Sequence, residues 1–282
     1  MCPDMGSACK RVSGIPDTNG KRYKSTHRHQ RMDLSVSSKI IFGDGRMKHI
    51  VNFSGGKDST AMLIRMIEEG MHIDDIVFIK VMATNEIGGD YPEMYEYIEK
   101  VEEYIGRKIT IVPSINSFDK VFHQKYQTGK RAGVIYGLPV TIGAWCNDRL
   151  KLKTIRQHYK IYGEHINYLG IAADEPKRLA KLQPNCRAPL AEWGMNEQDC
   201  LNYCFNHGWN WRENGVELYH VLDRVSCWCC TNKNKKEIQN IIKYLQEYWS
   251  RIKDYEKRCG IPYKRKGCAF FEKKVLSDNN KA

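Results

Sequence analysis

The sequence has no long hydrophobic run and no hydrophobic segment at its start. No stretch approaches the about 18 consecutive apolar residues of a membrane-spanning helix, which excludes that class of membrane protein. The first residues, Met1-Cys2-Pro3-Asp4, lack the apolar segment of a secretory signal peptide. Internal repeats and low-complexity tracts are absent as well. We therefore expect a cytoplasmic protein without membrane contact.

The chain is long enough for a full core, and its charge is unevenly distributed. Its 282 residues are 41% hydrophobic and 28% charged, as in globular proteins. Of the net charge of +12, residues 1–33 contribute +4 (seven Lys and Arg against three Asp) and residues 251–274 contribute +6 (nine against three). All other residues together contribute a net charge of only +2. Basic ends commonly meet phosphate backbones, so tRNA or DNA is a candidate partner. Solvated basic tails without a partner are an equal alternative.

Cysteine is abundant, with 11 residues in the chain. Disulfides are disfavoured in a reducing compartment, so this number favours metal binding or redox chemistry. Cys227, Cys229 and Cys230 form one cluster. Cys227 and Cys230 make a C-x-x-C pair, a spacing that can bind one metal ion. Five others show no ligand spacing and are interpreted as ordinary buried or free thiols: Cys2, Cys9, Cys186, Cys200 and Cys204.

Residues 49–60 predict a strand, a tight turn and the start of a helix. The apolar run ends at Phe53, and the adjacent Gly55 and Gly56 let the backbone adopt positive φ and approach a ligand. The amides of Ser54–Ser59 would then point at one spot, next to the positively polarised helix N-terminus. The pattern predicts a phosphate-binding loop, and a glycine-rich turn without a ligand is the alternative.

Side chains of this loop strengthen the prediction. Lys57 adds a mobile positive charge, and Asp58 and Ser59 are expected to cap the helix. The loop is not a Walker A loop, in which Ser or Thr follows the lysine directly. The string Ser-Gly-Gly-x-Asp-Ser instead resembles the pyrophosphate loop (PP-loop) of the adenine-nucleotide α-hydrolase superfamily. Under this resemblance Lys57 and Asp58 are the candidate catalytic residues.

Strand and helix patterns alternate after the loop. This alternation predicts right-handed crossovers and a parallel sheet that is covered on both faces. Strands are expected at 75–82, 108–113 and 167–171, and a short strand at 187–190. One helix is expected to begin at residue 91, a second to span 116–129 and a third to end at residue 159. Two more helices are expected at 196–207, capped by Asn196, and at 232–258, ended by Gly260. Four regions are expected: a mobile basic arm (1–38), a nucleotide-binding domain (39–225), a cysteine cluster with the long helix (226–260) and a basic tail (261–282) that is disordered from Lys273.

Five segments in order resemble the phosphoadenosine-phosphosulfate (PAPS) reductase family, from about residue 48 to about residue 235. They are Ser54–Ser59; Tyr91-Pro92-Glu93 with Tyr95-Glu96; Cys146 with Arg149-Leu150-Lys151; Gly170–Glu175 with Arg178; and Pro189-Leu190 with Trp193. The family implies an α/β fold with a doubly wound, mostly parallel sheet, here followed by a helical C-terminal extension. Such a sheet binds an adenine nucleotide at its carboxyl edge.

The resemblance also implies which residues surround the nucleotide. Ser54, Gly55, Gly56, Lys57, Asp58 and Ser59 would hold phosphate or pyrophosphate. Thr84 would lie against the nucleotide, in a turn where family members often have Asp-Thr-Gly and only the threonine is kept. Gly170 would adjoin the nucleotide, and Arg149, Lys151 and Arg178 would line its anionic side. A surface salt bridge is the alternative role for each of these three basic residues.

The family divides by chemistry. Sulfonucleotide reductases carry a C-terminal Glu-Cys-Gly-Leu-His segment with a nucleophilic cysteine, and this chain has only Arg258-Cys259-Gly260-Ile261-Pro262, interpreted as a helix end. We therefore expect the other chemistry: ATP is cleaved at its α-phosphate with Mg²⁺, and sulfur or nitrogen is transferred to the adenylated substrate. A sulfur-donor protein would then be a partner. A divergent reductase and an inactive nucleotide-binding accessory protein remain open.

In the iron–sulfur branch of this family, one cysteine group lies at the position of Cys146 and a C-x-x-C pair follows the last strand. Cys146, Cys227, Cys229 and Cys230 would supply four thiolates here. Four thiolates suit a [4Fe–4S] cluster or a tetrahedral zinc ion. The adjacent Cys229 and Cys230 favour the cluster, whose irons sit at separate corners. Unligated thiols are the third interpretation.

Overall fold

The structure is a computed structural model that describes residues 46–139 and 144–279. The chain separates into residues 1–42 and 43–282, and the description below concerns the second unit. The predicted arm at 1–38 therefore lies outside the described residues. No helix among the described residues is both long enough and apolar enough to cross a membrane.

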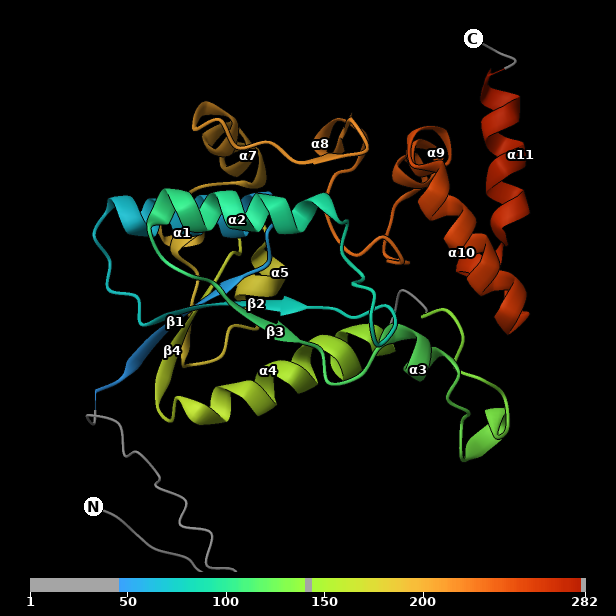
Figure 1. Ribbon diagram of the computed structural model, residues 1–282, viewed down its shortest axis with the longest axis horizontal. Coiled ribbons are helices and arrows are strands. Elements are labelled where there is room, and N and C mark those ends of the chain that lie inside the picture. The colour runs from blue at the N-terminus through green and yellow to red at the C-terminus, as the bar shows by residue number, and fades with distance from the viewer. Residues whose placement is uncertain (1–45, 140–143, 280–282) are drawn as a thin grey trace, which may run out of the picture. The chain divides into compact units, whose positions relative to one another are not determined.

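Five parallel strands form the central sheet, in the order β3-β2-β1-β4-β5 (Figure 1). They are β1 (Lys48–Phe53), β2 (Asp75–Lys80), β3 (Thr110–Pro113), β4 (His165–Leu169) and β5 (Cys186–Arg187). The chain moves outward from β1 to β3 and then returns to the other side of β1. This reversal between β1 and β4 defines a doubly wound sheet, which confirms the predicted fold class.

Helices cover both faces of the sheet. In Figure 1, α1 (Lys57–Glu68) and α2 (Glu93–Ile105) lie over one face, and α4 (Lys153–His158) lies over the other. Successive residues of a strand point to opposite faces, so Val51 of β1 belongs to the main core, whereas Ile50 packs in a smaller core with Tyr159. The strands are apolar on both sides for this reason.

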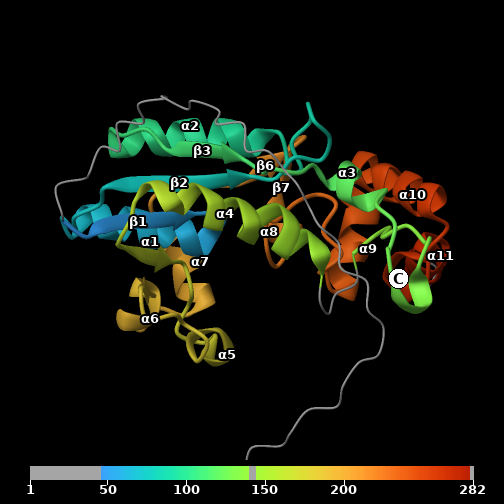
Figure 2. The same cartoon turned by 90° about the horizontal axis from the view of Figure 1, so that it is seen from below.

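The predicted helix at 232–258 is two helices. They are α9 (Lys235–Tyr244) and α10 (Gln246–Cys259), separated at Leu245, whose φ of −126° and ψ of 50° are not helical. Gly260 ends α10 in the left-handed conformation (φ 64°), as expected. The predicted disorder from Lys273 is wrong for the described residues, because α11 (Cys268–Asn279) continues through this position and packs against α9. In both views α9, α10 and α11 lie beyond one end of the sheet (Figures 1 and 2).

A second difference concerns the predicted helix at 116–129. Only α3 (Phe118–Phe122) forms, because the following residues pair in isolated bridges, Lys125 with Ile135 and Tyr126 with Ala132. The remaining elements are α5 (Pro176–Leu179), α6 (Pro189–Glu192), α7 (Glu197–Asn206), α8 (Leu218–Val221), β6 (Arg212–Glu213), β7 (Val216–Glu217), a π-helix (Asn147–Leu152) and 3₁₀ turns at Gly129–Arg131, Tyr159–Ile161 and Tyr263–Arg265. Asn196 caps α7 as predicted, and the expected short strand is β5 followed directly by α6.

Candidate functional site

The loop Ser54–Ser59, called the phosphate loop below, connects β1 to α1 at the point where the order of the strands reverses. Ligands of doubly wound sheets bind in the crevice outside the carboxyl ends of the strands at this point. Gly55 has a φ of +74°, and a Cβ atom there would lie 2.5 Å from the sulfur of Met94. The positive φ therefore favours glycine at this position, and an added Cβ would force the Met94 side chain to move.

Gly170 follows β4 and packs on the first turn of α1. A Cβ atom at this position would lie 2.9 Å from the backbone nitrogen of Ser59 and 3.0 Å from its Cα. The absence of a side chain thus brings the carboxyl end of β4 directly against the phosphate loop. This contact gives Gly170 a packing role, and its contact with a nucleotide remains a prediction.

The predicted side-chain caps of α1 are wrong. Gly56 occupies the cap position with extended φ and ψ (−85°, 169°), and neither Asp58 nor Ser59 caps a free amide of the helix. The Ser59 hydroxyl instead donates to the Gly56 carbonyl (3.0 Å) and accepts from the Ser54 amide (3.1 Å). Ser59 therefore closes the loop on itself and fixes its shape.

Lys57 is buried beneath the loop, with 4% of its surface exposed. Its ammonium nitrogen lies 2.8 Å from Asp58 Oδ1 and 2.7 Å from Glu197 Oε2. Burial alone would lower the pKa of Lys57, but the Asp58 and Glu197 carboxylates outweigh it and raise that pKa. The pKa of Asp58 is also raised, chiefly by burial and further by the nearby Glu197 and Glu175 carboxylates, against the opposing charge of Lys57. Glu197 belongs to no motif that predicts a site residue, and its only local signal in the sequence is its place at the start of a well-capped helix.

Two aromatic residues from the segment after α7 hold the phosphate loop. The Lys57 amide donates to the Tyr219 hydroxyl (2.7 Å), and the Trp211 indole donates to the Gly55 carbonyl (2.6 Å). With the Ser54 amide bound to Ser59, two of the amides predicted to face a ligand have internal acceptors. In the described part of the chain, the amides of Gly55, Gly56, Asp58 and Ser59 have no acceptor.

Three other predicted nucleotide contacts have structural partners. The Thr84 hydroxyl accepts from the Glu86 and Ile87 amides and shapes its own turn. Arg149 donates to the side chains of Gln124 and Tyr136, 2.9 Å each. Arg178 pairs with Glu175 at 2.7 Å and stays exposed. Each residue therefore has a structural explanation, and a role in nucleotide binding remains a prediction.

The four predicted cysteine ligands line one cavity of about 710 Å³, called the cysteine cavity below. Its lining also contains Trp145, Arg149, Lys151, Ser226 and Asn232. The cavity lies between Cys146 with the π-helix that follows it and the segment that precedes α9. The fold thus brings Cys146, Cys227, Cys229 and Cys230 together, although the first lies far from the others in sequence.

Charged groups are buried beside these thiols. The Cys227 thiol lies 3.8 Å from a carboxylate oxygen of Asp90. Negative charge on Cys227 raises the pKa of Lys151, burial opposes this effect, and the Asp90 carboxylate adds to it. Burial is also the main cause that raises the pKa of the Cys227 thiol and of the Asp90 carboxyl. Lys151 therefore lies in the cysteine cavity as a positive charge beside the thiols, in addition to Arg149.

The donor set fits a thiolate-bound metal, since four sulfur atoms and a compensating cation share one cavity. Within the described residues, however, no group of three or more His, Cys, Asp or Glu side chains converges on a point that could hold a metal ion.

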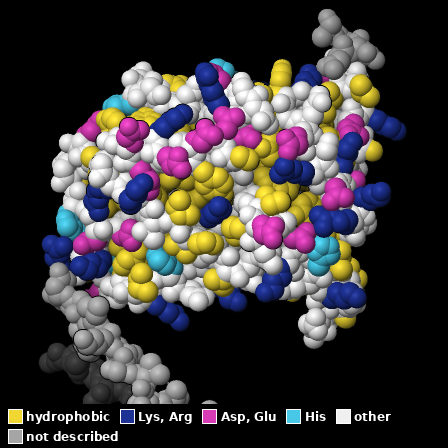
Figure 3. All heavy atoms as spheres, viewed as in Figure 1, with side chains coloured by type: hydrophobic (Ala, Val, Ile, Leu, Met, Phe, Trp, Pro, Cys, Tyr) yellow, Lys and Arg dark blue, Asp and Glu magenta, His cyan; other side chains and the backbone are white. Residues whose placement is uncertain are grey.

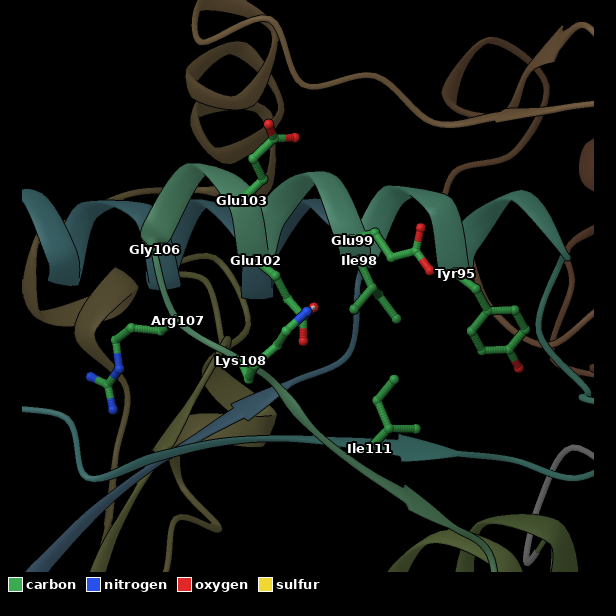
Figure 4. A pocket seen from close by; sticks show the side chains of 9 residues that line it. All are labelled: Tyr95, Ile98, Glu99, Glu102, Glu103, Gly106, Arg107, Lys108 and Ile111. Carbon is green, nitrogen blue, oxygen red and sulfur yellow. Dashed lines mark hydrogen bonds and ion pairs between the residues drawn. The ribbon is translucent and has the colours of Figure 1, made fainter.

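A separate pocket of about 540 Å³ lies between α2 and β3 (Figure 4). Glu99, Glu102 and Glu103 of α2 border it, and Lys108 pairs with Glu102 at 2.7 Å. None of the predicted site residues lines this pocket. Its carboxylates would repel phosphate, so the pocket is no substitute for the phosphate loop.

The chain matches the phosphoadenosine phosphosulfate reductase domain over residues 48–233. It belongs to the PAPS reductase family. The family assignment predicted from the sequence is confirmed. The match contains both the phosphate loop and the cysteine cavity, whereas α9, α10 and α11 lie beyond it.

Similar proteins include an uncharacterized nin region protein, ORF290, of Escherichia phage lambda, which is 26% identical over 212 residues, 68% of each chain. The uncharacterized protein MJ0066 of Methanocaldococcus jannaschii is 25% identical over 211 residues, 72% of this chain and 40% of the archaeal protein. The aligned part thus spans less than half the length of MJ0066. A similar solved structure is the U34-tRNA thiolase NcsA from Methanococcus maripaludis with its [4Fe-4S] cluster (14% identity, TM-score 0.41, 82% and 81% of the two chains). This similarity is too low to carry an argument about function.

Proposed function

We propose that this member of the PAPS reductase family binds ATP at the phosphate loop and cleaves it between the α- and β-phosphates. A substrate oxygen would attack the α-phosphorus, pyrophosphate would leave, and a sulfur or nitrogen nucleophile would then displace AMP from the adenylated substrate. The observation that carries the proposal is the set of four amides without acceptors, at Gly55, Gly56, Asp58 and Ser59. They lie at a helix N-terminus where the order of the strands reverses.

The side chains around the loop suit this reaction. Lys57 would exchange its carboxylate partners for the phosphate oxygens and neutralise charge on the leaving pyrophosphate. The freed Asp58 and Glu197 carboxylates, 21% and 38% exposed, offer oxygen ligands of the kind that Mg²⁺ prefers. Bound Mg²⁺ would supply charge stabilisation across the phosphate oxygens.

Product analysis tests the proposal. Purified protein with Mg²⁺, ATP and total tRNA should release AMP and pyrophosphate, and Asp58→Ala or Lys57→Ala should abolish both. Glu99→Gln, an exposed change in the pocket of Figure 4, is the matched control and should leave the rate unchanged. Release of ADP would contradict α-phosphate cleavage.

A second candidate is a nucleotide-binding accessory protein without turnover. The hydrogen bond from the Lys57 amide to Tyr219 favours it, because an internal hydroxyl already satisfies one donor of the loop. Tight ATP binding with no AMP release, in the presence of total tRNA and of a sulfide source, would support this candidate over the enzyme.

The proposal includes a metal centre in the cysteine cavity. Cys146, Cys227, Cys229 and Cys230 would hold a [4Fe–4S] cluster, or zinc as the alternative. A bound cluster would supply electron transfer or a site for sulfur, and Lys151 would balance the negative charge of the thiolates. A sulfur-donor protein and a tRNA or DNA acceptor belong to the same proposal.

A further inference from the structure

Residues 124–136 form a hairpin that follows α3, called the basic hairpin below. Its two sides are joined by backbone hydrogen bonds from Tyr126 to Val134 (2.9 Å) and from Tyr136 to Gln124 (2.7 Å). Residues 120–147 contain four Lys or Arg and no Asp or Glu, so no acidic residue of this segment offsets its charge. The hairpin projects at the lower right of Figure 1, and the same projection carries Lys or Arg side chains in Figure 3.

The cations of the basic hairpin have no acidic partner on other elements either. Lys125, Lys130 and Arg131 are exposed, and none of them forms an ion pair with another residue that the structure describes. The two nearest acidic residues in sequence, Asp119 and Asp148, pair with arginines of α10 and α4 at 3.0 and 3.3 Å. The hairpin therefore presents positive charge that an anion can neutralise.

Two arginines and two tyrosines form a continuous row on this hairpin. The rings of Tyr126 and Tyr136 lie side by side, with their centres 4.4 Å apart. The Arg131 guanidinium lies 5.8 Å from the centre of the Tyr126 ring, and the Arg149 guanidinium lies 4.7 Å from the centre of the Tyr136 ring. Contacts of this kind hold a guanidinium group over the face of a ring and restrict its orientation. The row thus brings cations from two separate segments to one surface.

Arg149 is the member of the row that reaches the cysteine cavity. It lines this cavity, and its guanidinium donates to the Gln124 side chain and to the Tyr136 hydroxyl, at 2.9 Å each. A guanidinium has five N–H donors, of which Arg149 uses two in the part of the chain that the structure describes. Because its partners are uncharged and several donors stay free, Arg149 suits a phosphate group, which accepts two parallel hydrogen bonds from arginine.

The base of the hairpin is fixed beside the same cavity. The carbonyl of Gly137 accepts a hydrogen bond (3.2 Å) from the indole of Trp145, which also lines the cavity. A Cβ atom at Gly137 would lie 2.9 Å from the Ile261 side chain and 3.2 Å from that of Cys259, so the base packs closely on the end of α10. The hairpin therefore has a defined position relative to the cavity, and a ligand bound along it can continue toward the thiols.

We propose that the basic hairpin binds the phosphate backbone of a single-stranded nucleic acid, with phosphates on its three exposed cations and on Arg149 beside the cysteine cavity. Tyr126 and Tyr136 orient the two guanidinium groups. A strand of regularly spaced phosphates matches cations that are spread along a hairpin and have no acidic partners. The inference rests on the proposed function, which names a nucleic-acid acceptor, and it supplies the surface for that acceptor. Binding itself requires no ATP, so the two proposals can fail separately.

The test is equilibrium binding of a fluorescein-labelled single-stranded RNA, and of DNA of the same sequence, by the full chain over a range of salt concentrations. The triple variant Lys125→Gln, Lys130→Gln, Arg131→Gln should bind at least about tenfold more weakly, and the slope of log K against log salt should fall by about 2. Tyr126→Leu, which removes the ring under Arg131, should weaken binding about threefold, whereas Tyr126→Phe keeps the ring and should bind normally. The RNA and DNA arms identify which sugar is preferred.

The matched control removes the same amount of charge from three exposed lysines on other segments: Lys100→Gln, Lys160→Gln and Lys181→Gln. This variant should bind the strand nearly as well as the unchanged protein. Equal weakening by both triple variants, or none by the hairpin variant, would overturn the proposal. So would hairpin-dependent binding to phosphatidylserine vesicles with strand binding unaffected. Asp58→Ala should keep strand binding, and the hairpin variant should keep ATP binding, which separates this surface from the phosphate loop.

Discussion

The backbone amide of Lys57 donates a hydrogen bond to the hydroxyl of Tyr219, 162 residues away in sequence and 2.7 Å away in space. Tyr219 follows β7, and its hydroxyl takes the position of an acceptor at the start of α1. A phosphate oxygen at this place would compete with the hydroxyl. The strength of nucleotide binding therefore depends on a residue outside the loop.

Tyr219→Phe removes this internal acceptor. We expect ATP to bind about fivefold more tightly, because the ligand no longer displaces a hydrogen bond worth about 1 kcal/mol. The free protein should lose a similar amount of unfolding free energy. Calorimetric titration with Mg²⁺-ATP and chemical denaturation measure the two effects. Weaker ATP binding would mean that the hydroxyl contacts the ligand itself.

Gly55→Ala should lower the free energy of unfolding by about 2 kcal/mol or more, because it combines an unfavourable φ with overlap with Met94. Gly70→Ala is the matched control: its φ is +65°, but nothing lies within 4 Å of the added atom. Its cost should be about 1 kcal/mol, from the backbone alone. Equal losses in urea denaturation would show that the contact with Met94 is not important.

Asp74 makes stability depend on pH at the acid end. Although burial opposes the effect, the His49 amide and the neighbouring positive charges lower the pKa of Asp74 below 3.8. A carboxylate with a lowered pKa stabilises the folded state above its unfolded value, and this contribution is lost as pH falls through the folded value. Asp74→Asn should therefore cost about 1 kcal/mol at pH 7 and progressively less below pH 3.8. A constant difference across acid denaturation curves would contradict this assignment.

The cysteine cavity predicts a metalloprotein. Anaerobic preparations should be brown, absorb near about 400 nm and contain iron if the cluster forms, or contain zinc in the alternative. Cys146→Ser or Cys227→Ser should remove most of the metal. Cys268→Ser, a buried cysteine outside the cavity, should retain it. Colourless protein free of iron and zinc from an anaerobic preparation would exclude a metal centre.

Local patterns were sufficient to predict much of the fold. The apolar run at β1, the paired glycines and the periodic helix after them each depend on neighbouring residues, and all three are present. The capping of α7 by Asn196 is equally local. No proline or glycine marks the break at Leu245, and the amphipathic pattern continues across it. The sequence therefore predicts one helix where the structure has two.

The site was harder to predict because its contacts are long-range. Glu197 reaches Lys57 because α7 packs on α1, and Tyr219 of α8 reaches it across 162 residues of sequence. Neither residue carries a recognisable motif. Ser59 is a residue type that commonly caps helices, but here its hydroxyl donates to the Gly56 carbonyl within the turn. The cysteine set was predicted from spacing and family resemblance, and the fold does place its members around one cavity.

The central claim is that the phosphate loop holds the phosphates of ATP with its backbone. A crystal structure of the protein with Mg²⁺ and a non-hydrolysable ATP analogue tests it most directly. The account predicts phosphate oxygens within hydrogen-bond distance of the free loop amides, those of Gly55, Gly56, Asp58 and Ser59, with Lys57 turned toward them. Phosphates bound elsewhere, with Lys57 still paired to Asp58 and Glu197, would contradict it.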